Sequence, residues 1–347
     1  MNSLPILMFQ AEPAAKLKFM SRYRAEEIDD DGVRLIRLSD SQEQLELTLA
    51  PQLGNRAIAF SVRGQNILHF PFANAKAAVG TRGLNGIPFL APWANRIEGG
   101  GFGANGRWFP FPGGENLLRT DANGLPIHGL LTASSLWEVT RTTADAAAAE
   151  VTCLLKFWQH PELMANWPFA HEYDITYRLA DGALEIRTEI RNLSAAPMPV
   201  SIGYHPYFVL PGVNRSACVA HIPVRLHVET NSKLVPTGEM TPANLSDPVP
   251  LAAQKLDDGF TDLVRDSSGN AIFWIEGAGK RIEVTFGPKY PVAIVYAPPG
   301  EEFICFEPMT ALTNGINLAW ENRYSALQSV ASDESWTESF WIRTVGF

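Results

Sequence analysis

The sequence has few cysteines, and those present are far apart. Cys153, Cys218 and Cys305 are the three cysteines among 347 residues. They are odd in number and lack the C-x-x-C spacing of common zinc sites, so the sequence suggests neither a disulfide framework nor a metal centre. A reducing compartment is the expected environment, and we predict a cytoplasmic protein.

Basic residues and long apolar runs are also scarce. Lys and Arg number 28 against 37 Asp and Glu, a net charge of -9. Nucleic-acid binders concentrate Lys and Arg, so this balance argues against such a partner. The apolar run at 4–9 is too short for a signal-peptide core. No segment approaches the roughly 20 apolar residues that span a bilayer. We expect neither nucleic acid nor membrane as a partner, and a small neutral or weakly charged ligand fits better.

The sequence is rich in apolar residues, punctuated by glycine and proline. Hydrophobic residues make up 46% of the chain, with 27 Gly and 25 Pro spread along its length. Short β-branched or alternating runs lie between them, which is typical of all-β proteins. No repeat or linker divides the chain, so we predict one large all-β domain, a β-sandwich over residues 31–347 after an N-terminal extension at 1–30. The strand-like runs are 33–40, 44–51, 136–143, 149–158, 171–194, 271–277 and 281–287.

Three local patterns predict turns. Asp181-Gly182 separates two alternating runs, and 277–279 separates another two, so each pair is expected to form a hairpin. The Ala-rich stretch 142–150 is too short for a stable helix and is expected to be a turn or a single helical turn.

The stretch GFGANG (101–106) has the G-x-G-x-x-G spacing of a dinucleotide-binding turn. Such a turn needs a helix after it, because the pyrophosphate binds at the helix N-terminus. Here the following GRWFPF is aromatic and contains proline, which is typical of a strand. We therefore predict a hairpin that turns at Asn105-Gly106, and no cofactor.

Four stretches differ from ordinary strand or turn sequence. The first, GIPFLAPWANRI (86–97), places Asn95 and Arg96 in a loop shaped by Gly and Pro, beside Trp93. An arginine there can simply pair with a surface carboxylate. Fixed donors beside a flat aromatic face are also what a polyhydroxylated ligand needs. Both interpretations remain open on the residues alone.

Two further stretches contain a histidine. NGLPIHGLL (123–131) includes His128, and SIGYHPYFVL (201–210) includes His205 among aromatic residues. Taken alone, each histidine is read more readily as a satisfied core residue than as a functional group. Pro206 follows His205 and favours extended backbone before it, which holds the histidine on stiff backbone near a strand end.

The fourth stretch, FICFEPMTALTNGIN (303–317), places Glu307 after an apolar strand-like run. A buried carboxylate without partners is costly, so Glu307 either faces water at a sheet edge or has a function. Pro308 follows it, as Pro206 follows His205, and such stiffened positions near strand ends suit catalytic groups.

These residues indicate one class of chemistry. Two histidines and a carboxylate are present without a nucleophile elbow, a P-loop or an H-E-x-x-H motif. General acid–base catalysis without covalent or metal steps is the class that fits. We expect no cofactor and no metal.

The ordered set PWANRI, PIHG, GYHPYF and FEPMT resembles the aldose 1-epimerase family, also called galactose mutarotase-like proteins. The resemblance extends from about residue 30 to the C-terminus and includes WPFAHEYDITYRL (167–179). Each motif alone is modest, but the ordered set is specific. The resemblance implies a large β-sandwich, known as a supersandwich, which agrees with the strand pattern.

The resemblance implies roles for two residues. Glu307 is expected to be the general base that removes the proton from the C1 hydroxyl of a cyclic aldose, and His205 the general acid at the ring oxygen. Opening and closing the ring then interconverts the α and β anomers. A carboxylate is a competent base at neutral pH. A histidine with a pKa near 6.5 is protonated often enough to act as an acid, more so if the carboxylate lies close.

The resemblance also implies a sugar-binding set. His128 and Arg96 match the family's other histidine and its substrate-binding arginine, and Asn95 belongs to the same motif as Arg96. In DDGF (257–260), either Asp257 or Asp258 matches the sugar-binding aspartate. A carboxylate accepts hydrogen bonds from two vicinal hydroxyls, so both suit the task.

Two other functions stay open. The surroundings SIGY (201–204) and EPMT (307–310) differ from those in the better-known galactose mutarotases, so galactose is not implied as the substrate. A hexose-6-phosphate 1-epimerase would need extra cations at the pocket, for which Arg56, Arg82 and Lys76 are candidates. A non-catalytic sugar-binding or sensing protein is the third hypothesis, although both acid–base residues are present.

Overall fold

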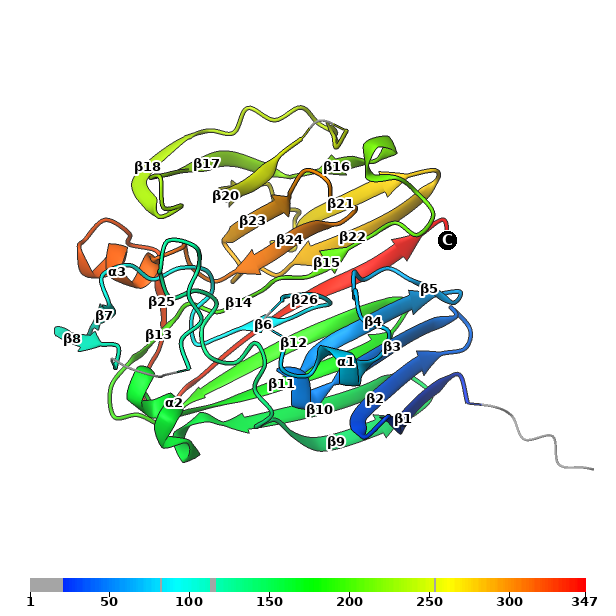
Figure 1. Ribbon diagram of the computed structural model, residues 1–347, viewed down its shortest axis with the longest axis horizontal. Coiled ribbons are helices and arrows are strands. Elements are labelled where there is room, and N and C mark those ends of the chain that lie inside the picture. The colour runs from blue at the N-terminus through cyan, green and yellow to red at the C-terminus, as the bar shows by residue number, and fades with distance from the viewer. Residues whose placement is uncertain (1–20, 82, 113–116, 253) are drawn as a thin grey trace, which may run out of the picture.

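The computed structural model describes residues 21–81, 83–112, 117–252 and 254–347, and strands dominate these ranges (Figure 1). Three short α-helices interrupt them: α1 (Ala75–Ala78), α2 (Pro161–Asn166) and α3 (Gly315–Trp320). Single 3-10 turns lie at Pro51–Leu53, Phe157–Gln159 and Arg215–Ala217. Within the described ranges, no helix combines the length and hydrophobicity that a bilayer crossing requires.

A nine-stranded antiparallel sheet forms one layer of the molecule. Its interior strands are the long hairpin runs of the sequence, where alternate residues are buried. The strands follow the order β19 (Val249–Pro250), β16 (Val219–His221), β21 (Ala271–Gly277), β22 (Lys280–Phe286), β26 (Ser335–Val345), β12 (Ala183–Asn192), β11 (His171–Ala180), β10 (Ala149–Lys156) and β9 (Glu138–Ala144).

A five-stranded and an eight-stranded sheet cover this layer. The first has the order β1 (Tyr23–Asp30), β2 (Val33–Asp40), β3 (Leu45–Ala50), β4 (Arg56–Val62) and β5 (Gln65–Asn66). The second has the order β18 (Pro236–Pro242), β17 (Val224–Thr230), β20 (Leu256–Leu263), β23 (Val292–Ala297), β24 (Ile304–Met309), β14 (Gly203–Tyr204) and β6 (Phe89–Leu90), with β15 (Tyr207–Phe208) also paired to β24.

Aromatic side chains hold the layers together. Phe306 of β24 contacts Phe273 of β21 with ring centroids 5.6 Å apart, and Tyr204 of β14 packs on Phe340 of β26 at 4.8 Å. The Tyr177 hydroxyl of β11 donates to the Asn55 carbonyl just before β4, at 2.6 Å. One continuous buried apolar cluster includes residues of all three sheets. The fold is therefore a β-sandwich with one core, as the sequence predicts.

Two small antiparallel pairs complete the fold: β13 (Met198–Val200) with β25 (Gln328–Val330), and β7 (Gly101–Ala104) with β8 (Arg107–Pro110). The second pair contains the G-x-G-x-x-G stretch. It is the predicted hairpin, with Phe102 opposite Phe109 and the turn at Asn105-Gly106. Strand β8 follows the turn directly, where a dinucleotide-binding turn requires a helix, so this stretch does not have that arrangement.

The two other hairpins are confirmed, and the Ala-rich stretch 142–150 is a turn only in its middle, at residues 145–148. Asp181-Gly182 joins β11 to β12, and β21 pairs with β22 up to Gly277 opposite Lys280. The Ala-rich stretch continues β9 and then turns, with the Asp145 amide bonded to the Ala148 carbonyl. Residues 23–30 form β1, which pairs along its length with β2. Residues 1–20 lie outside the described part of the chain, and the domain boundary at residue 31 stays a prediction.

Candidate active site

The candidate site lies on the face of the eight-stranded sheet that points away from the core. On β24 the Phe306 ring packs into the core, so the next side chain, Glu307, points to the opposite face. Glu307 lies opposite Ile294 of β23, and Ile294 lies opposite Gly259 of β20. Three adjacent strands therefore contribute one row of residues to this face.

His205 is held between two short strands that pair, one after the other, with the same edge of β24. β14 ends at Tyr204 and β15 begins at Tyr207, so His205 and Pro206 form the link between them. The His205 ring stacks on the Tyr207 ring with centroids 4.5 Å apart and an interplanar angle of 4°. Its Nε2 lies 3.2 Å from Oε1 of Glu307. The strand pairing thus brings together two groups that are 102 residues apart in the sequence.

Two loops run side by side over this pair and place His128. The His128 amide donates to the Asn95 carbonyl at 2.9 Å, and the Asn95 amide donates to His128 Nδ1 at 3.3 Å. Both residues have positive φ, +56° at Asn95 and +62° at His128. Because Nδ1 accepts, the proton of the neutral ring is on Nε2. The His128 and His205 ring centroids are 5.6 Å apart.

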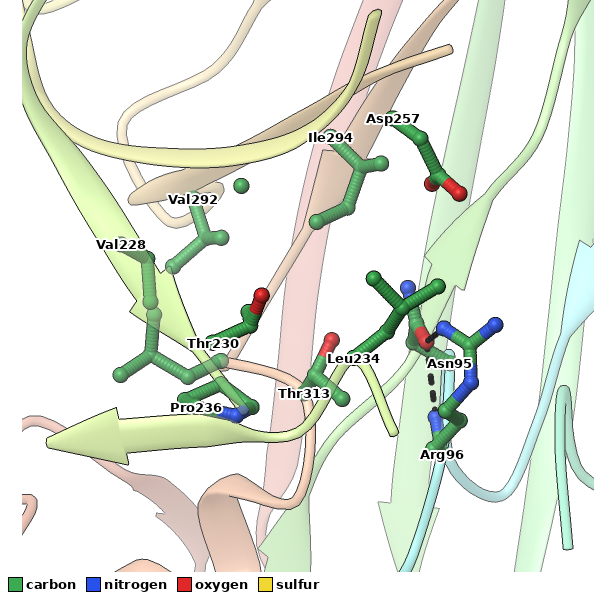
Figure 2. A pocket seen from close by; sticks show the side chains of 12 residues that line it. Asn95, Arg96, Val228, Thr230, Leu234, Pro236, Asp257, Val292, Ile294 and Thr313 are labelled. Carbon is green, nitrogen blue, oxygen red and sulfur yellow. Dashed lines mark hydrogen bonds between the residues drawn. The ribbon is translucent and has the colours of Figure 1, made fainter. Parts of the chain in front are cut away.

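Arg96 is fixed by a buried ion pair. Its Nε donates to Asp121 Oδ2 at 2.7 Å, and its Nη1 donates to Asn95 Oδ1 at 3.0 Å (the Asn95 bond is drawn in Figure 2). The Asp121 side chain is 8% exposed. Although burial opposes ionisation, the hydrogen bonds from Arg96 and from two backbone amides lower the pKa of Asp121. Arg96 is therefore held rigidly by a charged partner.

The two catalytic candidates, the two loops and the strands β20 and β23 line a single cavity. It encloses about 590 Å³, including open space at its mouth. Asp257 of β20 stands at its mouth. Asp258 is directed elsewhere, with Oδ1 3.1 Å from His227 Nε2. The lining residues are Leu84, Asn95, Arg96, Arg119, Ile127, His128, His205, Tyr207, Asp257, Ile294, Tyr296 and Glu307.

Burial dominates the electrostatics of the catalytic candidates. Glu307 is 1% exposed, and burial, with a smaller repulsion from Asp257, raises its pKa well above its usual range. Burial lowers the pKa of His205 to about 3. The close carboxylate that was expected to keep His205 protonated is present, but desolvation outweighs it. The two opposite shifts favour one proton on the pair, carried by Glu307.

Two other lining groups are also shifted. Burial lowers the pKa of His128 well below 6.5, and the neighbouring His205 adds to this effect, so His128 is neutral and donates through Nε2. Burial raises the pKa of Asp257, although Arg96 opposes the shift. Arg96 likewise opposes the shift of Glu307. One arginine thus stabilises the ionised forms of both carboxylates.

The structure brings six of the seven predicted site residues to this cavity and leaves Asp258 outside it. Their roles stay predictions. Glu307 is not at a water-facing edge, because β24 lies between β23 and β14. Trp93 offers no flat face to a ligand, since it is fully buried against Trp167 and Phe111.

Sequence reasoning missed several residues of the site, among them Asp121, Arg119 and Tyr296. For Asp121 a signal existed, because Asp-Ala-Asn-Gly (121–124) is a turn sequence just before the His128 motif. Its carboxylate accepts from the amides of Asn123 and Leu125. Arg119 and Tyr296 sit in ordinary loop and strand sequence, and their place follows from the fold alone.

Comparison with known proteins identifies similar chains. A model of the family described as aldose 1-epimerase matches residues 50–343. A galactose mutarotase-like protein from Clostridium acetobutylicum has 22% identity and a TM-score of 0.83, covering 94% of this chain and 99% of that one. Galactose 1-epimerase from Lactobacillus acidophilus has 15% identity and a TM-score of 0.71, with 94% and 99% covered. A Synechocystis protein has 22% identity and a TM-score of 0.71, with 98% and 100% covered. These structural likenesses concern the fold.

Proposed function

This chain belongs to the aldose 1-epimerase family, and we propose that it interconverts the α and β anomers of a free aldose by acid–base ring opening and closure. The observation that carries the proposal is the contact of 3.2 Å between His205 Nε2 and Glu307 Oε1 at the base of the cavity. Ring opening and closure require one group that takes a proton from the sugar and another that gives one, and a buried acid–base pair facing a cavity supplies both.

The lining residues divide into two groups in this proposal. Glu307 and His205 exchange protons with the sugar. His128, Arg96 and Asp257 bind it: His128 Nε2–H and the guanidinium donate, and the Asp257 carboxylate accepts from hydroxyl groups. Tyr207 keeps the His205 ring in place by stacking on it.

The reaction is a balanced exchange of protons. Glu307 takes the proton of the C1 hydroxyl while His205 protonates the ring oxygen O5, and the C1–O5 bond breaks to give an aldehyde at C1 and a hydroxyl at C5. Rotation about C1–C2 presents the other face of the aldehyde. On closure the C5 hydroxyl returns its proton to His205 as O5 attacks C1, and Glu307 protonates the C1 oxygen. The opposite anomer results, and both residues are restored.

The pair begins with the number of protons that this reaction needs. The reactive form has an ionised Glu307 and a protonated His205. It differs by one proton transfer across the 3.2 Å contact from the form that burial favours. Oε2 of Glu307 is buried and has no hydrogen-bond partner among the described residues. A C1 hydroxyl that donates to Oε2 stabilises the carboxylate and so favours the reactive form.

Polarimetry of freshly dissolved α-aldoses tests the proposal. The wild-type protein is expected to hasten the approach to anomeric equilibrium, while Glu307→Gln is not. A panel of neutral hexoses and pentoses ranks the substrates. If no free or phosphorylated sugar responds although sugars still bind by calorimetry, the proposal is wrong and the chain is a binding protein.

A sugar 6-phosphate is the second candidate substrate, because arginines line a neighbouring cavity. This cavity encloses about 1150 Å³, including open space, and shares Leu84 and Arg119 with the first. Arg56 lines it and is 4% exposed. Its guanidinium donates to Asn85 Oδ1 and to the Thr132 carbonyl, and it forms no ion pair with a described residue.

Of the other two cations expected for a phosphate, the structure describes Lys76 alone. Lys76 pairs with Asp31 at the surface, 2.8 Å away, and Arg82 lies outside the described residues. The same polarimetric assay with hexose 6-phosphates separates the two substrates. A phosphate preference that Arg119→Gln removes favours the second candidate.

A further inference from the structure

The aromatic residue Tyr207 lies beside the acid–base pair because of the strand register. β14 and β15 pair with β24 in one register, and Tyr207 lies opposite Cys305. In that register His205, between the two short strands, is level with Glu307. Side chains two residues apart on extended backbone share a face. Tyr207 and His205 therefore lie on the same face as Glu307, and all three line the cavity.

The Tyr207 ring stacks on the His205 ring in a place that water hardly reaches. The ring centroids are 4.5 Å apart and the planes differ by 4°. The Tyr207 hydroxyl lies 3.4 Å from His205 Nε2, the nitrogen that contacts Glu307. Tyr207 is 7% exposed and His205 6%. The histidine is thus in contact with an aromatic face and a carboxylate at once.

Tyr207 is itself held in place from several sides. Its amide donates to the Gly86 carbonyl, and its carbonyl accepts from the His69 amide, each at 2.9 Å. The Phe303 ring packs on the Tyr207 ring with centroids 4.9 Å apart and an interplanar angle of 71°. The Tyr207 ring is therefore a fixed surface, and a fixed surface can set the place of the ring that is stacked on it.

The proposed reaction needs a positive charge on His205, and the surroundings oppose it. Burial lowers the pKa of His205 to about 3, and Arg119 acts in the same direction. His128, with its ring centroid 5.6 Å away, is neutral and adds no negative charge. The face of an aromatic ring has partial negative charge and attracts a cation within about 6 Å of its centroid, most strongly where water is excluded. The Tyr207 ring meets both conditions.

We propose that Tyr207 is a positioning residue of the reaction: its ring face stabilises the charge of protonated His205 and keeps the imidazole beside Glu307. The inference rests on the proposed function, in which His205 is the acid. Tyr207 acts through the histidine, so the electron-rich face of its ring is required. Its hydroxyl is dispensable in this role.

The test changes the charge of the ring face and leaves its shape. Tyr207→Phe keeps an electron-rich face, whereas pentafluorophenylalanine at position 207 has nearly the same shape and an electron-poor face. The kcat for the best aldose is expected to stay within about twofold of wild type with phenylalanine and to fall by about fivefold to thirtyfold with the fluorinated ring. KM should change little in either variant. Pentafluorophenylalanine at position 303 is the matched control, because it fluorinates a ring that packs on Tyr207, and its kcat should match wild type.

Each outcome supports or overturns this role. A kcat that falls with the fluorinated ring and not with phenylalanine supports it. Equal kcat values for the two rings overturn it: if both match wild type, the charge of the face is not used, and if both are slow, the hydroxyl is what matters. Monofluorinated and trifluorinated phenylalanines give the same comparison in smaller steps if urea unfolding shows that the pentafluorinated variant does not fold. If the wild type turns over no sugar, the proposed function fails and this inference fails with it, whereas wild-type turnover that the fluorinated ring leaves unchanged overturns this inference alone.

Discussion

Replacing Glu307 with glutamine should lower activity and raise stability at the same time. The amide has nearly the same shape but cannot take the C1 proton. Loss of a general base typically lowers the rate by about 10² to 10⁴, or about 3 to 5 kcal/mol of transition-state stabilisation. The kcat for the best aldose is expected to fall by that factor, while the sugar-binding groups remain.

The stability effect follows from the raised pKa of Glu307. Between the ordinary value of 4.5 and its raised value, the folded protein holds one proton more than the unfolded chain, because burial disfavours the carboxylate. The free energy of unfolding therefore falls by about 1.4 kcal/mol for each pH unit in that window. Below the window the carboxyl is protonated in both states and the effect vanishes. Glutamine carries no such penalty at any pH.

Urea unfolding followed by tryptophan fluorescence measures this difference. The advantage of Glu307→Gln over the wild type is expected to be largest at mildly alkaline pH and to shrink towards zero near pH 4.5. His205, whose pKa is lowered, makes stability fall as the pH drops below 6.5 in both proteins, so the difference isolates Glu307. A wild type that becomes more stable than the variant as pH rises would refute the reasoning, because it would mean that the fold stabilises the carboxylate.

Three further changes test other parts of the site. The wild-type kcat/KM should decrease as the pH rises through the raised pKa of the acid–base pair, because His205 then has no proton to donate. A pH–rate profile that keeps rising to about pH 9 would contradict this. Asp121→Asn removes the charge that holds Arg96, so it should raise KM by about tenfold with a smaller decrease in kcat. A decrease in kcat as large as the increase in KM would argue against a positioning role for Asp121. Gly129→Ala should lower the free energy of unfolding by about 2 kcal/mol or more. The new Cβ would overlap the Ala91 carbonyl oxygen, and residue 129 has a φ of +66°, which strains any residue other than glycine. An unchanged midpoint in a urea titration would contradict this prediction.

Most of the strands could be predicted because their residues alternate and their turns carry clear signals. β11 and β12 are half-buried strands joined by Asp-Gly, and the pattern sets both their type and their pairing. Short strands such as β6, β14 and β15 have two residues each and no pattern of their own. β14 and β15 are strands because β24 lies beside them, and β6 is a strand because it pairs with β14. None of the three could be predicted from local sequence.

The choice between Asp257 and Asp258 shows a related limit. Adjacent residues of a strand point to opposite faces, so the sequence allows one aspartate at the site but cannot say which. The pairing of β20 with β23 decides it: Asp257 lies opposite Tyr296, which lines the cavity, and Asp258 lies opposite Val295, which is fully buried. A shift of one residue in that register would exchange the two carboxylates.

Glu307 is the hardest residue to assign from the sequence, because many of the residues around it are far away in the chain. All six residues of β24 are buried, so the strand shows no alternation that separates a core face from an outer face. The outer face is covered by the loops that carry Asn95 and His128. The same loops therefore exclude water from the carboxylate and supply the groups that bind the sugar beside it. The packing of these loops on β24 therefore has two consequences: it raises the pKa of Glu307 by desolvation, and it forms a site that can use the proton of Glu307. No local motif contains that packing.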